Sequence, residues 1–436
     1  MRSVLLISPD NIAKKMSGPG IRYLNFAREL SKKLSVVLFI PNKETDMSFE
    51  NEKFEVIIGD KGVLKNKVKE VDSVVVQGIA FRLYPFLKHI KKPIAVDIYD
   101  PITLENLELR KFLSLKERVD YHETDVNILL EQLAIGDFFI CASEKQKDYW
   151  MGMLSALNRI NPVTYTDDVQ MKKLIDVVPF GFNDEEPKKN KNVLKGVWPN
   201  INEDDKVLIW GGGIWNWFDP ITLIESMKDI CLKRNDIKLF FMGIGHPSLN
   251  VDTTVADECI SRSKKYGIYN KNVFFNEWVD YNERQNYLLE ADIGVSTYLN
   301  NLETRYSFRT RILDYLWCDL PMVLTNGDYM SELVEKNDLG FCHTGGNHEE
   351  LANKILELID NKEKYQEAKQ NIRQVKEAYK WNNVVKPLLQ FCENPYISSD
   401  KVKKVKFFYK SQGLMKYYYV RIISKLKRMI KKVIFK

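Results

Sequence analysis

Short apolar runs alternate with amphipathic segments along the first 180 residues. Seven runs rich in Val, Ile, Leu and Phe recur there: SVLLISP, SVVLFIP, FEVIIG, SVVVQGI, PIAVDIYD, DFFICAS and DVVPFGF. Runs of this length predict strands, and the helical patterns between them predict parallel β-α-β connections. This part of the chain is therefore expected to form a parallel sheet wrapped by helices.

The same pattern restarts after a polar stretch, NDEEPKKNKNVLKGVWPNINEDD. Six further apolar runs follow it: KVLIWGG, IKLFFMGIG, NVFFNEW, DIGVSTY, PMVLTNG and GFCHTG. A chain of 436 residues also exceeds what one hydrophobic core usually organises. The sequence thus predicts two doubly wound α/β domains.

The expected domain organisation has five segments. They are an N-terminal Rossmann-like domain over 1–182, a linker over 183–203, a second Rossmann-like domain over 204–375, a C-terminal helix over 376–398 that packs back on the first domain, and a basic tail over 399–436.

Composition narrows the class of protein. With 44% hydrophobic and 28% charged residues the chain is typical of a globular protein. Its six cysteines show no CxxC pair, and its histidines show no metal-ligand spacing, so neither a zinc site nor a disulfide framework is expected. The N-terminus has only five apolar residues before a Ser-Pro-Asp turn, and no apolar run approaches the roughly 18 residues that span a bilayer. A cytoplasmic protein is expected.

The charge is unevenly distributed. Residues 401–436 contain 13 Lys and Arg and no acid, which leaves 52 basic against 59 acidic residues in the remainder. An acidic body argues against a nucleic-acid-binding domain. In the tail, apolar side chains from Met415 to Val433 and basic ones from Lys416 to Lys432 fall on opposite helical faces. This predicts a helix on the anionic inner face of the plasma membrane; a partner-docking helix and a disordered basic tail are the alternatives.

Glycines follow the first strand of each half. They are Gly18 and Gly20 in the first half and Gly211, Gly212 and Gly213 in the second. Glycines between a strand and a helix have no side chain, so their backbone N–H groups can approach an anionic ligand closely. Tight turns explain the first pair equally well, whereas three consecutive glycines favour a ligand. No acid ends the second strand, so NAD is disfavoured.

The segment NLETRYSFRTRILDYLW carries the clearest chemistry. Ser307 is expected to cap a helix whose first turn holds Arg309 and Arg311, with Asp314 one turn on. Basic residues in a first turn oppose the helix dipole unless an anion lies between them. A phosphate held by the arginines and a ribose held by Asp314 satisfy this arrangement. Ion pairs of the arginines with Glu303 or Asp314 are the structural alternative.

The two-domain pattern, with DLPMVL and VFFNEWVDYNERQNYLLEADIGVSTY, resembles the retaining nucleotide-sugar glycosyltransferases of family 4 over roughly residues 1–395. WGGGIWNWFDP and SFRTRILDYLW resemble a bacterial branch that makes surface polysaccharides such as capsule or lipopolysaccharide. The resemblance implies the GT-B fold, in which two Rossmann-like domains face a central cleft. It also implies a donor nucleotide in the second domain and an acceptor mainly in the first.

The resemblance also implies roles for individual residues. The family signature has two glutamates separated by seven residues, with a Phe two after the first. Here Phe308 matches the Phe, Asp314 replaces the second acid and Tyr306 replaces the first. Asp314 is thus the implied ribose ligand, Glu303 is the candidate for the sugar contact, and Thr310 is counted with the substrate-binding residues.

Two family cations are missing from the glycine loop. The family has an Arg and a Lys where this chain has Gly213 and Phe218. The loop is therefore expected to contact phosphate through its backbone only, with Arg309 and Arg311 replacing the lost charges. The neighbouring Trp215 is either a wall of the ligand site or part of the core.

The first domain supplies one catalytic candidate. Where family members often have His-Asp, this chain has Tyr99 and Asp100, so a catalytic His is absent. A retaining transfer tolerates this because the departing phosphate takes the acceptor proton while positioned charges stabilise the transition state. Asp100 is expected to orient the acceptor hydroxyl, and a strand-end cap is its alternative role.

The sequence thus predicts a metal-independent glycosyltransferase without a cofactor. It is expected to move a sugar from a nucleotide diphosphate to a glycan or lipid-linked glycan. Two other functions stay open: a non-catalytic partner that binds nucleotide sugar, and a GT-B sugar-nucleotide epimerase.

Overall fold

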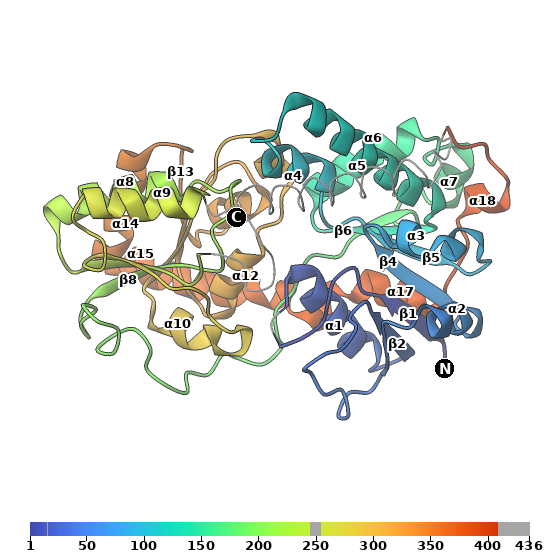
Figure 1. Ribbon diagram of the computed structural model, residues 1–436, viewed down its shortest axis with the longest axis horizontal. Coiled ribbons are helices and arrows are strands. Elements are labelled where there is room, and N and C mark those ends of the chain that lie inside the picture. The colour runs from blue at the N-terminus through green and yellow to red at the C-terminus, as the bar shows by residue number, and fades with distance from the viewer. Residues whose placement is uncertain (15, 245–253, 409–436) are drawn as a thin grey trace, which may run out of the picture. The chain divides into compact units, whose positions relative to one another are not determined.

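The computed structural model describes residues 1–436 except 15, 245–253 and 409–436 (Figure 1). The chain divides into two compact units. Unit 1 contains residues 1–12 and 19–178 and the described residues from Lys386 onward, and unit 2 contains residues 13–18 and 179–385. The expected linker, 183–203, belongs to unit 2. The described part of the expected tail, 399–408, belongs to unit 1.

Unit 1 is built on a parallel sheet of seven strands in the order β3-β2-β1-β4-β5-β6-β7. The strands are β1 (Ser3–Ile7), β2 (Ser35–Ile40), β3 (Glu55–Ile58), β4 (Ser73–Gln77), β5 (Ile94–Asp97), β6 (Phe138–Cys141) and β7 (Ile175–Val177). The central strands β1, β4, β5 and β6 are almost wholly buried, as both faces of a helix-covered parallel sheet must be.

Helices connect these strands, and two further helices of unit 1 come later in the chain than its last strand. They are α1 (Gly18–Leu30), α2 (Lys61–Glu70), α3 (Ala80–Leu83), a 3-10 helix (Pro85–His89), α4 (Ile102–Leu109), α5 (Leu115–Ile135), α6 (Glu144–Ala156), α7 (Pro162–Asp167), α17 (Lys386–Glu393) and α18 (Ser399–Val402).

Unit 2 repeats the plan with six parallel strands in the order β10-β9-β8-β11-β12-β13. The strands are β8 (Lys206–Trp210), β9 (Ile237–Phe241), β10 (Val273–Phe275), β11 (Ile293–Ser296), β12 (Met322–Thr325) and β13 (Gly340–His343). In both sheets the strand order reverses beside the first strand, which is the doubly wound arrangement. The predicted pair of Rossmann-like domains is confirmed.

The helices of unit 2 include a contiguous layer of α9, α8 and α14 (Figure 1). The full set is α8 (Pro220–Lys233), α9 (Thr254–Lys265), η2 (Tyr281–Glu283), α10 (Arg284–Glu290), α11 (Leu302–Tyr306), α12 (Thr310–Trp317), α13 (Tyr329–Lys336), α14 (His348–Asp360), α15 (Lys362–Val375), η3 (Lys376–Tyr379) and α16 (Trp381–Val384).

None of the helices within the described ranges has the length and apolarity that a membrane crossing requires. All six cysteines are free thiols. The predicted amphipathic face between Met415 and Val433 lies outside the described residues.

The C-terminal segment is fixed to unit 1 by a buried ion pair. Arg159 donates from Nε to Asp400 Oδ2 over 2.7 Å, and both side chains are fully buried. Arg159 also donates to the carbonyl of Leu133, and its guanidinium lies 4.7 Å from the ring centre of Phe407. The segment that precedes the basic tail is therefore part of the folded unit.

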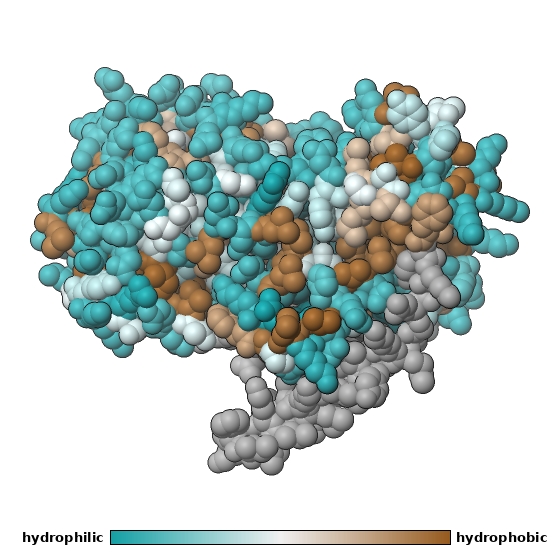
Figure 2. All heavy atoms as spheres, turned by 90° about the horizontal axis from the view of Figure 1, so that it is seen from above, coloured by the Kyte–Doolittle hydropathy of each residue, from teal (hydrophilic) through white to brown (hydrophobic). Residues whose placement is uncertain are grey.

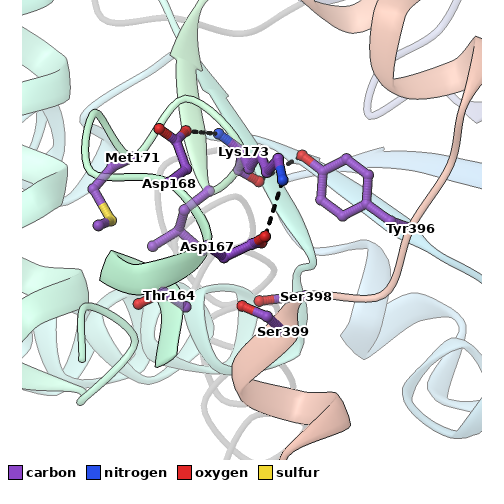
Figure 3. A pocket seen from close by; sticks show the side chains of 9 residues that line it. Thr164, Asp167, Asp168, Met171, Lys173, Tyr396, Ser398 and Ser399 are labelled. Carbon is purple, nitrogen blue, oxygen red and sulfur yellow. Dashed lines mark hydrogen bonds and ion pairs between the residues drawn. The ribbon is translucent and has the colours of Figure 1, made fainter. Parts of the chain in front are cut away.

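A small pocket marks where this segment meets α7 (Figure 3). The Tyr396 hydroxyl donates to the carbonyl of Lys173, and the side chain of Lys173 pairs with Asp167 over 2.9 Å. Nearby, Lys401 pairs with Asp137 over 2.7 Å, and burial lowers the pKa of Lys401. These contacts fix the described C-terminal segment to unit 1.

We expect Asp400→Asn to lower the free energy of unfolding by about 3–5 kcal/mol, because it leaves the Arg159 cation buried without a counter-charge. Chemical denaturation measures this change. The control is Asp204→Asn, which changes an exposed acid and should have little effect. A loss below about 1 kcal/mol in Asp400→Asn would show that the ion pair contributes only as much as a surface pair.

Candidate functional site

Tyr315 ties α12 to the glycine loop that follows β8. Its hydroxyl accepts a hydrogen bond from the backbone N–H of Gly211 over 2.9 Å and lies 2.9 Å from the carbonyl oxygen of Val295. A Cβ on Gly294 would lie 2.5 Å from the Tyr315 ring, so only glycine fits there. The ring thus passes across β11 to reach the loop.

The loop itself has an open backbone. Gly212 adopts φ +77°, a left-handed conformation that favours glycine, and no atom lies within 4 Å of where its Cβ would be. A Cβ on Gly213 would lie 3.0 Å from the Trp215 ring. A side chain at Gly213 therefore displaces Trp215, whereas the backbone at Gly212 is accessible to a ligand.

Arg311 is a cation without a matching carboxylate in the described part of unit 2. Its Nη2 donates to the carbonyl of Gly213 over 2.9 Å, while its buried Nη1 has no hydrogen-bond partner among the described residues. Its guanidinium lies 4.0 Å from the ring centre of Phe218 and 4.5 Å from that of Trp210. Burial lowers the pKa of Arg311 to about 10. Such a group favours an anion beside it.

Arg311 also contacts the two positions at which the sequence resemblance implies cations that this chain lacks. It is hydrogen-bonded to Gly213 and stacked on Phe218. The positive charge beside the glycine loop is therefore supplied by a side chain of α12 and not by a residue of the loop.

Arg309 has a different environment. Its Nη1 and Nη2 donate to the two oxygens of Glu303 over 3.0 and 2.7 Å, and both side chains are buried. Its Nε lies 3.9 Å from Asp328. The ion pair with Glu303 is the structural alternative that the sequence left open, and it occupies both oxygens of the candidate sugar ligand.

The predicted cap of α12 is wrong. The helix begins at Thr310, and Arg309 stands at the N-cap position without a side-chain cap. Ser307 instead follows the last residue of α11, and its hydroxyl donates to the carbonyl of Thr304. The short helix α11 ends at Tyr306, and the residues that follow connect it to α12, so Arg309 precedes the first turn of α12. The sequence pattern does not reveal where α11 ends.

Asp314 is oriented by an arginine that the sequence analysis did not select. Arg284 donates from Nε to Asp314 Oδ1 over 2.9 Å. The Arg284 guanidinium lies 3.7 Å from the ring centre of Tyr281 and 4.6 Å from that of Trp317. Asp314 remains partly exposed. Its carboxylate is thus held in place while keeping access to a ligand.

The remaining unit 2 candidates lie around this site in sequence and space. Trp215 stacks on Trp217 with ring centres 5.8 Å apart, and it remains partly exposed. Tyr306 is the last residue of α11, and Thr310 is the first of α12. Both are partly exposed.

In unit 1, Asp100 lies three residues beyond the end of β5, and its backbone carbonyl accepts from Ile102. Gly18, which is the last residue of the short N-terminal segment of unit 2, begins α1, and Gly20 of unit 1 is buried in the first turn of this helix. A pair that the sequence pattern did not indicate links α1 to β5: Arg22 donates from Nε to Asp97 over 2.7 Å, with both side chains fully buried. A basic residue in α1 after a glycine turn was the available signal.

No group of three His, Cys, Asp or Glu side chains that can hold a metal ion occurs in the described ranges. The groups around the glycine loop are instead backbone amides, one arginine and one oriented carboxylate.

Residues 198–375 match the model of the family Glycosyl transferases group 1. This segment contains β8 to β13, the glycine loop and α12. The matched segment covers most of unit 2. No curated protein sequence matches the chain.

Solved structures resemble the whole described fold. Sucrose-phosphate synthase from Thermosynechococcus elongatus is 14% identical, with 90% of this chain and 98% of that one covered and a TM-score of 0.63. Alr3699/HepE from Anabaena, solved in complex with UDP and glucose, is 16% identical, with 90% and 99% covered and a TM-score of 0.62. WaaG, a glycosyltransferase involved in lipopolysaccharide biosynthesis, is 12% identical, with 90% and 100% covered and a TM-score of 0.62. At these identities the likeness shows the fold, and the predicted GT-B fold is confirmed.

We expect Arg311→Met to raise the free energy of unfolding of the ligand-free protein by about 1–3 kcal/mol, because an apolar side chain of similar length removes a poorly compensated buried charge. Thermal unfolding without ligand measures this. Arg305→Met, at an exposed position on α11, is the matched control and should change stability little. Destabilisation of Arg311→Met alone would show that the Gly213 carbonyl and the two rings already compensate the charge.

Proposed function

We propose that the protein is a retaining, metal-independent glycosyltransferase that moves a sugar from a nucleotide diphosphate to a glycan or lipid-linked glycan in surface polysaccharide synthesis. The observation that carries the proposal is the Nη1 of Arg311, without a hydrogen-bond partner among the described residues, beside the open backbone of Gly212. A buried cation next to accessible backbone amides fits an anionic ligand. The family match makes a diphosphate the natural choice.

In this proposal the donor lies along the loop and α12. Arg311 and the loop amides hold the diphosphate, aided by the N-terminus of α12. Asp314, held by Arg284, accepts the ribose hydroxyls with the oxygen that Arg284 leaves free. Trp215 forms a wall beside Gly213. The UDP and glucose bound by HepE are consistent with this class of donor.

Arg309 and Glu303 act as one unit in the proposal. Because each satisfies the other, the pair fixes the turn between α11 and α12 that carries Tyr306 and Thr310 toward the sugar. Arg309 supports the phosphate site through this pair and through its positive charge, which lies 5.1 Å from the Phe218 ring centre.

The acceptor is assigned to unit 1. Asp100 orients the attacking hydroxyl, and Gly20 leaves room for the acceptor in the first turn of α1. The departing phosphate takes the hydroxyl proton, so no histidine base is required. The charge that develops on the phosphate is stabilised by Arg311.

The proposed location is the inner face of the plasma membrane, with residues 409–436 on anionic lipid. The predicted lipid-binding segment, 401–436, begins too early, because Lys401 pairs with Asp137 in unit 1. The involvement of WaaG in lipopolysaccharide biosynthesis is consistent with a membrane-bound acceptor. Because residues 401–408 are anchored in unit 1, a truncation that isolates the tail begins at residue 409.

We expect Arg311→Ala to weaken binding of a nucleoside diphosphate by about 2–3 kcal/mol, or roughly 30- to 150-fold in Kd, because a charge-assisted contact is lost. Binding of the nucleoside without phosphate should change far less. Arg309→Ala should also weaken diphosphate binding, but with a loss of folding stability, since Glu303 is left buried and unpaired.

Titration calorimetry against a panel of nucleotides measures these affinities, with Arg305→Ala as the matched control. Unchanged diphosphate affinity in the Arg309→Ala/Arg311→Ala protein would refute the phosphate site.

We expect Asp100→Asn to retain donor binding and lose at least about 100-fold in transfer rate, because the acceptor hydroxyl is no longer oriented by a carboxylate. The wild-type rate should survive EDTA. Transfer of radiolabelled sugar to membrane glycolipid measures both. Full dependence on added magnesium would contradict metal independence.

Two alternatives give different results. Donor binding without transfer in the wild type would indicate the non-catalytic partner. Conversion of the donor without acceptor would indicate the epimerase.

A further inference from the structure

A buried amide without a partner lies at the carboxyl edge of the unit 1 sheet. Figure 2 shows hydrophobic residues in separate patches among hydrophilic ones, so apolar exposure does not single out one ligand site on the face that it draws. Buried polar atoms without partners are a sharper signal, because a folded protein leaves few of them. One that the proposed donor site does not use belongs to Gln77.

Gln77 is the last residue of β4, and its side chain is almost wholly enclosed. The residue is 7% exposed, and its buried Oε1 has no hydrogen-bond partner among the described residues. An unpaired acceptor in the interior costs free energy, and native proteins rarely keep one unless a ligand or an ordered water satisfies it. The Gln77 amide is therefore a candidate ligand-binding group.

Gln77 lies where the strand order of unit 1 reverses. In the order β3-β2-β1-β4-β5-β6-β7, the reversal falls between β1 and β4. Ligands of doubly wound sheets bind outside the carboxyl ends of the strands at this point. Gly78 follows there with φ +62°, and no described atom lies within 4 Å of where its Cβ would be. The backbone next to the amide is thus open to a ligand.

Two polar neighbours of Gln77 on this edge are already paired. Asp97 is opposite Gln77 in the β4–β5 register, and its two oxygens accept from Nε and Nη2 of Arg22 over 2.7 and 3.2 Å. The backbone N–H of Tyr99 also donates to Asp97. On the other side, the β1–β4 register extended by two residues places Ser8, whose hydroxyl donates to a carbonyl two residues further on. A partner for the amide therefore has to come from outside this group.

The chemistry of this edge favours an uncharged hydroxyl as the ligand. The charge of Arg22 is neutralised by Asp97, and both side chains are fully buried. The unpaired atom of Gln77 is an oxygen, which needs a donor, and an ionised phosphate or carboxylate supplies none. A hydroxyl both donates and accepts, so it satisfies either end of an amide. The hydroxyls of a sugar meet this requirement.

We propose that the Gln77 amide, beside the open backbone of Gly78, binds a hydroxyl group of the sugar acceptor. The inference rests on the proposed function, which assigns the acceptor to unit 1. It adds a group that recognises the acceptor to Asp100, which orients the attacking hydroxyl. An acceptor that lacks the recognised hydroxyl leaves the amide unpaired again, and sites of this kind discriminate strongly against such analogues. Gln77 thus contributes to acceptor affinity, whereas Asp100 contributes to the rate.

Transfer of radiolabelled sugar to detergent-solubilised membrane glycolipid tests this division. Gln77→Leu should raise KM for the glycolipid roughly ten-fold and leave kcat and donor binding within about two-fold, because only an acceptor contact is lost. The variant should unfold at the same temperature as the wild type or a higher one, since an apolar side chain replaces an unpaired amide. Lower stability with an unchanged KM would show that the amide is structural and would overturn the contact.

Gln132→Leu is the matched control. Gln132 is 4% exposed and lies near the end of α5, which leads to the amino end of β6 at the opposite edge of the sheet. Its Nε2 donates to the carbonyl of Ile128 over 3.4 Å. This variant should lose some stability and keep the wild-type KM.

Binding without donor separates the contact from the transferase activity. Hydrogen exchange of residues 73–80 should slow when glycolipid is added to the wild type, and should not slow in Gln77→Leu. Glycolipid treated with periodate, which oxidises vicinal hydroxyls, should protect neither protein. If the wild type transfers sugar and Gln77→Leu matches it in KM and in protection, the contact is wrong and the proposed function stands. If the wild type transfers no sugar, the proposed function is wrong, and equal exchange in both proteins overturns the contact as well.

Discussion

The hydroxyl of Tyr315 is the contact on which the proposed donor site of unit 2 depends. It brings together the backbone of Gly211, the end of β11 and the helix α12 within hydrogen-bond distance. Because α12 is held there, Arg311, one turn earlier on the same helix, reaches the carbonyl of Gly213. The position of the Arg311 guanidinium therefore depends on the Tyr315 side chain, which packs across β11. Gly294 leaves the space that the Tyr315 ring needs.

Arg311 and Arg309 lie two residues apart, but only Arg309 is paired with a carboxylate within the described part of the chain. Arg309 is neutralised by Glu303, whereas Arg311 contacts only a carbonyl and aromatic rings within the described part of the chain. A charge that a folded protein leaves uncompensated costs stability, and such costs concentrate at functional sites. In the proposed function, Arg309 therefore supports the turn and Arg311 recognises the ligand. Their identical residue type does not reveal this difference.

The sequence predicted the fold well and the site only in part. The thirteen strands of the described ranges were apparent because buried parallel strands are continuous apolar runs. The partners of the site residues were not apparent, because they come from distant segments: Arg284 meets Asp314 and Arg22 meets Asp97 only after folding. The end of α11 at Tyr306 was missed for a local reason, since helices this short leave no periodic pattern. The expected roles of Asp100, Asp314 and the glycines remain predictions.

The return of the chain from unit 2 to unit 1 has a consequence for how the protein is made. Arg159 precedes residues 179–385, the main segment of unit 2, yet its counter-ion Asp400 follows that segment and leaves the ribosome after it. Before Asp400 is synthesised, the Arg159 guanidinium has no carboxylate to pair with. Burial of an unpaired guanidinium is unfavourable, so this part of the core of unit 1 is not complete while unit 2 is being synthesised. The order of translation thus opposes the usual N-terminal-first folding of multidomain proteins. Unit 1 therefore buries Arg159 with its counter-charge only after Asp400 has been synthesised.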